Sequence, residues 1–136
     1  MTIVVDASVF IEAERRHLDV PEIVALVLPE ERLTVASIAV SELLVGMHLA
    51  DTVHKRRERE DFVERIVNAF PVLAFDVAVA GVYAEIWAHL RSSGNLIPPH
   101  DLMIGATALH FDFQVLTHNL RHFARIPGLR VIEPNW

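Results

Sequence analysis

Short runs of β-branched residues alternate along the chain with longer stretches of helical periodicity. The first run, residues 3–5, is apolar without interruption, as in a strand buried on both faces of a sheet. The pattern predicts strands over residues 3–5, 33–36, 71–75, 114–117 and 130–132. It predicts helices over residues 8–16, 21–28, 38–50, 52–69, 77–91 and 100–111. Such alternation is typical of an α/β domain with a mainly parallel sheet.

Residues with strong end preferences mark the expected helix boundaries. Pro21 suits a first helical turn and Pro29 ends the same helix, while Ser37 and Asp76 are expected N-caps. The mixed charges of residues 55–61 predict a solvated helix face with ion pairs. One later helix carries an apolar stripe expected to face the core, made of Tyr83, Ile86, Trp87 and Leu90.

Length and composition narrow the class of protein. The chain has 136 residues, a net charge of −6 and no cysteine, so we expect one domain spanning 1–136 without disulfides or thiolate metal sites. No apolar run is long enough to cross a membrane, and residues 1–6 do not resemble a signal peptide, so a cytoplasmic protein is expected. The negative charge argues against broad nucleic-acid coating but permits a nucleic-acid enzyme with local positive charge.

Three acidic residues occupy unusual positions. Asp6 ends the first strand, and ligands of open α/β sheets bind outside the carboxyl ends of the strands. Glu42 interrupts an apolar helix, so it either faces solvent or reaches a site. Asp101 lies in the first turn of a helix, where an acid is also favoured for purely structural reasons. All three fit one edge of one sheet, together with Asn119, which follows the strand 114–117.

Converging carboxylates need a cation between them, because their charges repel. Oxygen ligands without cysteine select Mg²⁺ or Mn²⁺ over zinc. Such ions polarise a phosphodiester, activate water and stabilise the leaving oxygen, which indicates phosphodiester hydrolysis and also permits a phosphatase. The eight histidines show no zinc-ligand spacing, so a zinc site is not expected.

Four segments carry a family resemblance: residues 3–11, 41–46, 99–108 and 115–123. Their order and spacing resemble the PIN-domain nucleases, and in particular the VapC-type toxins of toxin–antitoxin pairs. The resemblance implies a three-layer α/β/α fold and an endoribonuclease that uses Mg²⁺ or Mn²⁺ and metal-activated water. It also implies a homodimer, a cognate antitoxin and an RNA substrate. The implied catalytic and metal-binding residues are Asp6, Glu42 and Asp101, with supporting roles for Ser8, Thr117 and Asn119.

The chain departs from the family pattern at one place. Many relatives carry a fourth acid at or just after the position of Asn119, where this chain has an amide and then His122. An amide can still hold a water molecule by a hydrogen bond. One tightly held metal is therefore expected rather than two.

Positive residues near the motifs are candidate RNA contacts, because arginine binds phosphate through two parallel hydrogen bonds. Arg15 and Arg16 follow the first helix, and Arg121 and Arg125 follow the last motif; Arg15 and Arg121 are the candidates chosen from these pairs. The alternative function is a weakly active or inert PIN-like module that binds protein or RNA. A receiver-type switch normally needs an adjacent acid pair after the first strand and a lysine at a late strand end, whereas Ala7 follows Asp6 and the only lysine, Lys55, lies in a helix. An aspartyl phosphatase needs an aspartate two residues after Asp6, where Ser8 stands.

Overall fold

The computed structural model describes residues 1–27 and 30–136. Five strands form one parallel sheet in the order β3-β2-β1-β4-β5. The predicted α/β architecture with a parallel sheet is therefore confirmed. The strands are β1 (Thr2–Val5), β2 (Arg32–Ala36), β3 (Val72–Leu73), β4 (Gln114–Leu116) and β5 (Val131–Ile132).

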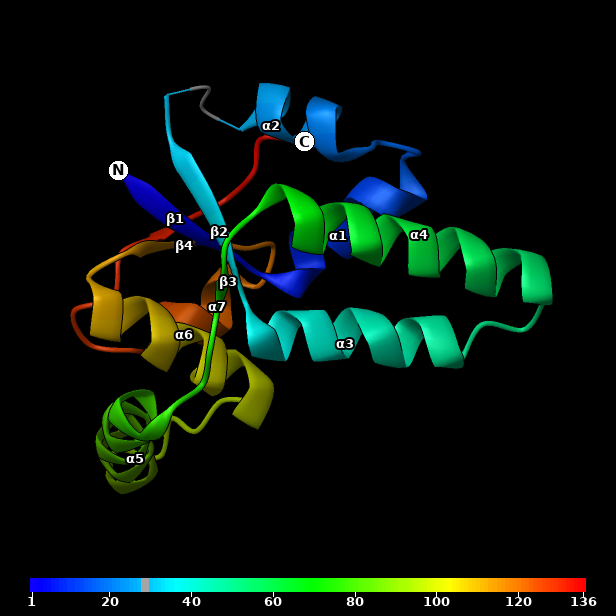
Figure 1. The fold of residues 1–136 in the computed structure, drawn as a ribbon. Coiled ribbons are helices and arrows are strands. Elements are labelled where there is room, and N and C mark those ends of the chain that lie inside the picture. The colour runs from blue at the N-terminus through cyan, green and yellow to red at the C-terminus, as the bar shows by residue number, and fades with distance from the viewer. Residues whose placement is uncertain (28–29) are drawn as a thin grey trace.

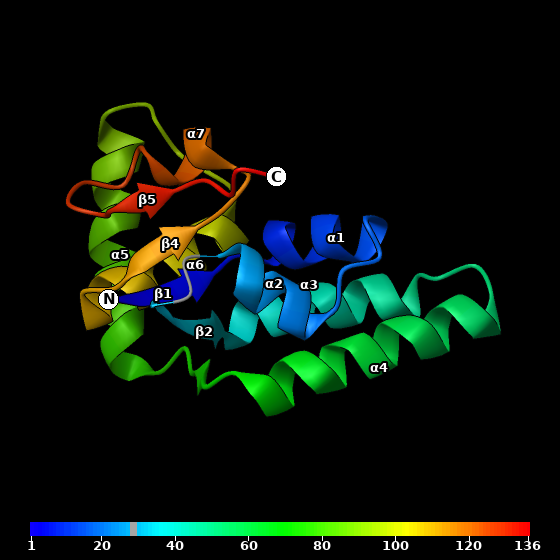
Figure 2. The same ribbon diagram turned by 90° about the horizontal axis from the view of Figure 1, so that it is seen from above.

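Helices connect the strands and cover the sheet. Figures 1 and 2 place α2 over one face of the sheet and α6, with α5 beyond it, over the other, while α3 and α4 lie side by side and extend away from the sheet. The described helices are α1 (Ala7–Arg15), α2 (Val20–Leu26), α3 (Ser37–His48), α4 (Val53–Ala69), α5 (Val77–Ser92), α6 (Pro99–Phe111) and α7 (Leu120–Phe123). None of the helices in the described ranges is long and apolar enough to cross a membrane.

The strand order creates a crevice at the centre of the sheet. From β1 the chain adds β2 and then β3 on one side, and β4 then pairs with the other side of β1. Ligand sites of open parallel sheets lie where the order reverses in this way, outside the carboxyl ends of the two central strands. Asp6 follows β1 and Thr117 follows β4 at this point.

Several local predictions are confirmed. Pro21 lies in the first turn of α2, and Asp76 caps α5 by accepting a hydrogen bond from the Val79 N–H at 3.0 Å. The charged residues of α4 are mostly exposed and form ion pairs, such as Lys55 with Asp51. The expected end of the second helix at Leu28 and Pro29 lies outside the described residues.

Three predictions need correction. Ser37 does not cap α3: the helix begins at Ser37 itself, because Ala36 already has the extended backbone of an N-cap. Trp87 is 37% exposed rather than part of the core, and the Arg91 guanidinium lies 5.3 Å from its ring centre. The strand expected over 71–75 is limited to Val72–Leu73, because only these residues pair with β2.

Candidate active site

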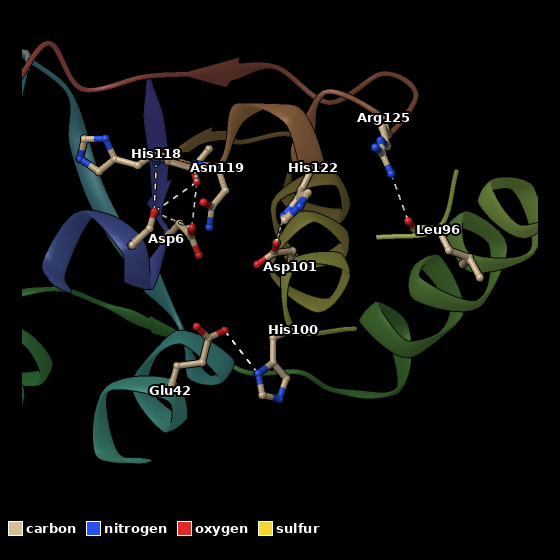
Figure 3. A network of polar contacts seen from close by, with 11 residues as sticks. Asp6, Glu42, Leu96, His100, Asp101, His118, Asn119, His122 and Arg125 are labelled. Atoms are coloured by element: carbon tan, nitrogen blue, oxygen red, sulfur yellow. Dashed lines mark hydrogen bonds and ion pairs between the residues drawn. The ribbon is translucent and has the colours of Figure 1, made fainter. Parts of the chain in front are cut away.

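Asp6 is the most deeply buried of the three acids, with 1% of its surface exposed. Its Oδ2 accepts hydrogen bonds from the hydroxyls of Ser8 and Thr117, both at 2.8 Å. The Ser8 hydroxyl in turn accepts a hydrogen bond from the backbone N–H of His118 at 3.1 Å, and the Thr117 hydroxyl accepts one from the backbone N–H of Asn119 at 2.8 Å. The turn after β4 is thereby tied to the start of α1, and the Asp6 carboxyl group is held in one orientation (Figure 3).

Asp101 is held by a different partner. It lies in the first turn of α6 and is 8% exposed. Its Oδ2 lies 2.6 Å from Nδ1 of His122, which belongs to the short helix α7. The close packing of α6 against the segment after α7 supports this contact: a Cβ atom on Gly105 would lie 2.3 Å from Cδ1 of Ile126. A glycine at this position therefore lets the Asp101 and His122 helices approach.

Glu42 faces the same space from α3 without such support. Its Oε1 is buried yet makes no hydrogen bond to the described residues. The nearest charged partner, Nδ1 of His100, lies 3.6 Å away, which exceeds hydrogen-bond distance, and His100 is itself 58% exposed. Figure 3 shows the carboxyl groups of Asp6, Glu42 and Asp101 directed toward one space, with the Asn119 side chain between the two aspartates.

The pKa values of Glu42 and Asp6 reflect the nearness of the other acids. Burial raises the pKa of Glu42 to about 7, and the negative charges of Asp6 and Asp101 add to the effect. Burial also raises the pKa of Asp6, with a further contribution from Asp101, while the hydrogen bonds from Ser8 and Thr117 oppose the rise. Carboxyl groups that raise one another's pKa in this way lack a positive charge between them.

The oxygen ligands of these residues are the type that a hard divalent cation prefers, but the side chains do not surround a position for one. The oxygen donors, the mutual repulsion and the buried, unpartnered Oε1 of Glu42 all match what Mg²⁺ or Mn²⁺ satisfies. Within residues 1–27 and 30–136, however, no group of three acidic or histidine side chains is arranged closely enough to hold a metal ion.

Two cavities flank the acids. One, of about 180 Å³, is bordered by Glu42, Arg15 and apolar residues of α1, α3 and α4. The other, of about 440 Å³, is bordered by Ser8, Asn119 and again Arg15. Arg15 therefore borders both cavities. Arg121 is exposed on α7 and borders neither of these two cavities.

Two features of the site were absent from the sequence predictions. The sequence gives His122 no role in the site, whereas the structure places it against Asp101. The helix α7 that carries it has four residues and was not predicted. Trp136 borders the cavity beside Ser8 and Asn119. It lies more than a hundred positions after Ser8 and seventeen after Asn119, and no local sequence pattern predicts its position there. The N-cap position of Asn119 was the available signal for α7.

A parallel sheet with three acids directed toward its central crevice defines an α/β protein with a candidate site lined by carboxyl groups. Residues 3–129 match the family model of the PIN domain, and the chain belongs to this family. Among curated proteins it is similar to "Ribonuclease VapC" of Rickettsia bellii, with 32% identity over 97% of this chain and 96% of that protein. It is also similar to the "tRNA(fMet)-specific endonuclease VapC" of Salmonella typhimurium, with 33% identity over 76% of each chain.

Solved structures agree with this placement. The toxin–antitoxin assembly VapBC of Salmonella typhimurium, determined bound to DNA, contains a chain that superposes with a TM-score of 0.85 at 27% identity, covering 98% of both chains. The FitAcB structure from Neisseria gonorrhoeae superposes with a TM-score of 0.83 at 28% identity, covering 97% of both. The expected PIN-like fold is therefore confirmed over nearly the whole chain.

Proposed function

We propose that this protein is an endoribonuclease that uses Mg²⁺ or Mn²⁺ and acts as the toxin of a toxin–antitoxin pair. The observation that carries the proposal is the convergence of Asp6, Glu42 and Asp101 on one space at the crevice of a PIN-domain sheet. The names of the VapC relatives from Rickettsia bellii and Salmonella typhimurium support a ribonuclease.

The three carboxylates are proposed as both metal ligands and catalytic residues. When bound, a divalent ion supplies positive charge that offsets the charge developing on the phosphate oxygens during cleavage. Asp6 and Asp101 contribute ligands whose positions are set beforehand, because hydroxyls hold the first and His122 holds the second. Ser8 and Thr117 support the site by orienting Asp6, and Asn119 supports it by fixing Thr117.

In the proposed hydrolysis a water molecule attacks phosphorus. A new phosphorus–oxygen bond forms, the bond to the leaving ribose oxygen breaks, and that oxygen takes up a proton. Glu42 Oε1 is suited to accept the proton lost by the water, because it faces the common space without a hydrogen bond to the described residues. Arg15, at the edge of both cavities, is placed to contact a phosphate of the substrate.

The proposed protein partner is a cognate antitoxin, as in the VapBC assembly of the Salmonella relative. Carboxylates that repel one another would attract a basic side chain from such a partner, since a guanidinium can replace the charge of the metal. The homodimer implied by the family resemblance stays a prediction.

Cleavage of RNA by the purified protein tests the proposal. We expect the wild-type protein to cleave total cellular RNA with Mg²⁺ or Mn²⁺ and to lose this activity when EDTA removes the ion. Asp101→Asn should abolish cleavage while leaving the circular dichroism spectrum unchanged. Glu64→Gln, at an exposed position of α4, is the matched control and should cleave like the wild type.

The inert-module alternative makes a different prediction. An inert module would neither cleave RNA nor bind Mn²⁺ in the millimolar range in a manner that depends on Asp6. Mn²⁺ titration of the wild type and of Asp6→Asn by calorimetry separates the two functions. Equal, negligible heats for both proteins, together with uncleaved RNA, would overturn the proposal.

A further inference from the structure

We propose that the cavity next to Asp6 is a subsite for one nucleotide of single-stranded RNA, with Trp136 as its base-stacking residue and Arg16 as its phosphate contact. The inference rests on the proposed ribonuclease function and adds where the substrate lies. The cavity has a volume of about 440 Å³. The lining residues used in the argument are Ser8, Arg15, Arg16, His118, Asn119 and Trp136.

Two aromatic rings form one wall of this cavity. The rings of His118 and Trp136 lie 5.7 Å apart at an angle of 82°. Figure 3 shows His118 directed away from the space between the acids, toward the side of the turn opposite Asp101. Aromatic side chains beside a nuclease site offer a surface on which a base can stack, and stacking tolerates any sequence because every base has a π-face.

The Trp136 indole has no polar contact to hold it in place. Its Nε1 is buried but makes no hydrogen bond within the part of the chain that the structure describes. A buried indole N–H normally has a partner, so the position seen here leaves a donor unsatisfied. A bound nucleotide offers a stacking surface to the part of this side chain that borders the cavity.

Positive charge accompanies the rings. The Arg16 guanidinium lies 5.9 Å from the centre of the Trp136 ring. Arg15 and Arg16 share one acidic partner, Glu12, at 3.8 and 3.0 Å. Two guanidinium groups against one carboxylate leave a net positive charge at the cavity. An aromatic ring combined with a positively charged rim is the arrangement by which proteins bind single-stranded nucleic acid.

The position of the cavity connects it to the reaction. Ser8 both lines the cavity and donates a hydrogen bond to Asp6, and Asn119 both lines the cavity and binds Thr117. A base held against Trp136 would therefore lie next to the residues that hold Asp6 and the turn after β4. The subsite would position the nucleotide adjacent to the bond that is cleaved.

Tryptophan fluorescence tests this assignment without catalysis. The chain has two tryptophans, so Trp87→Phe leaves Trp136 as the sole tryptophan, which is excited selectively at wavelengths where tyrosine does not absorb. In an Asp101→Asn background, titration with an unlabelled ten-nucleotide RNA of mixed sequence should quench Trp136. Anisotropy of the same RNA carrying fluorescein should show affinity weakened roughly 5- to 100-fold by Trp136→Ala, the range expected for loss of one stacked base. Trp136→Phe should retain most of the affinity, and Trp87→Ala, a change on α5, should retain all of it.

The outcomes separate this proposal from the one on which it rests. If the wild type cleaves RNA while Trp136 fluorescence does not respond and Trp136→Ala binds the labelled RNA as tightly as its parent, the subsite is wrong and the nuclease stands. If the wild type does not cleave RNA and no variant binds it, both proposals fail. The Trp136→Phe variant keeps the test decisive should Trp136→Ala unfold, since circular dichroism identifies that case.

Discussion

Asp6 and Glu42 face the same space but are held in opposite ways. The carboxyl group of Asp6 lies at the end of a central strand, and two buried or half-buried hydroxyls donate to one of its oxygens. Glu42 approaches from α3 on a longer side chain whose buried Oε1 has no hydrogen bond to the described residues. The first acid is positioned by the fold before any ion arrives, whereas the second is free to adjust.

The two carboxyl groups show how a crowded acidic site can remain folded. Hydrogen bonds from Ser8 and Thr117 stabilise the charged form of Asp6 and partly offset the cost of its burial. Glu42 has no hydrogen bonds of this kind, so burial and the charges of Asp6 and Asp101 raise its pKa to about 7. A ligand that is destabilised when alone gains the most from a bound cation.

The largest expected effect comes from comparing substitutions of the two acids. Asp6→Asn should lower the rate of RNA cleavage about 1000-fold, the upper range for removal of one pre-organised charge-stabilising group. Glu42→Gln should lower it about tenfold to 100-fold, because a mobile ligand is more easily replaced by water. Single-turnover cleavage measures both rates. Equal losses of cleavage rate in the two variants would show that Asp6 and Glu42 contribute equally, against the expectation.

A smaller effect is expected when the support of Asp6 is removed. Thr117→Val keeps the shape of a fully buried side chain but leaves both Asp6 and the Asn119 N–H without this partner. The free energy of unfolding, measured by urea denaturation, should fall by about 1–3 kcal/mol.

The control for this substitution is Thr107→Val. Thr107 is also buried, but its hydroxyl only donates to the Met103 carbonyl within the same helix. We expect a loss below about 1 kcal/mol for the control, since no second group depends on that hydroxyl. If Thr117→Val lowers the free energy of unfolding no more than Thr107→Val does, the Thr117 hydroxyl does not support Asp6 in the way we infer.

The smallest effect concerns pH. Burial and the neighbouring acids raise the pKa of Glu42 from its ordinary value of 4.5 to about 7 in the folded protein, so between these values the folded state binds more protons than the unfolded state. The free energy of unfolding therefore decreases as the pH rises through this window. The side chain is 24% exposed, so solvent screening limits the loss to about 1–2 kcal/mol.

Thermal denaturation in EDTA at pH 5 and pH 8 measures this dependence. Comparing the wild type with Glu42→Gln at each pH removes the contribution of the other titrating groups. The stability of the variant relative to the wild type should be higher at pH 8 than at pH 5. Mg²⁺ should stabilise the wild type more at pH 8 than at pH 5, because ligands must be deprotonated to bind. A Glu42→Gln variant that follows the wild type at both pH values would contradict the adjustable, high-pKa assignment.

Local patterns in the sequence determined most of the fold. The β-branched run of β1, the Asp76 cap and the first-turn position of Asp101 each depend on residues within a few positions of one another. The same patterns placed Asp6 and Thr117 at the ends of strands, and a parallel sheet brings such ends to one edge. Ser37 shows the limit of this reasoning, since the backbone of Ala36, rather than the preference of serine for N-caps, decided where α3 begins.

Only the tertiary structure decided how each acid is held. The contact of His122 with Asp101 joins two helices twenty-one positions apart in the chain, and the Trp136 wall of the neighbouring cavity joins residues far more distant. The unpartnered oxygen of Glu42 likewise results from what packing leaves out of reach. Periodicity reports which face of an element is buried, whereas partners and pKa values depend on distances between elements, and these exist only after the chain has folded.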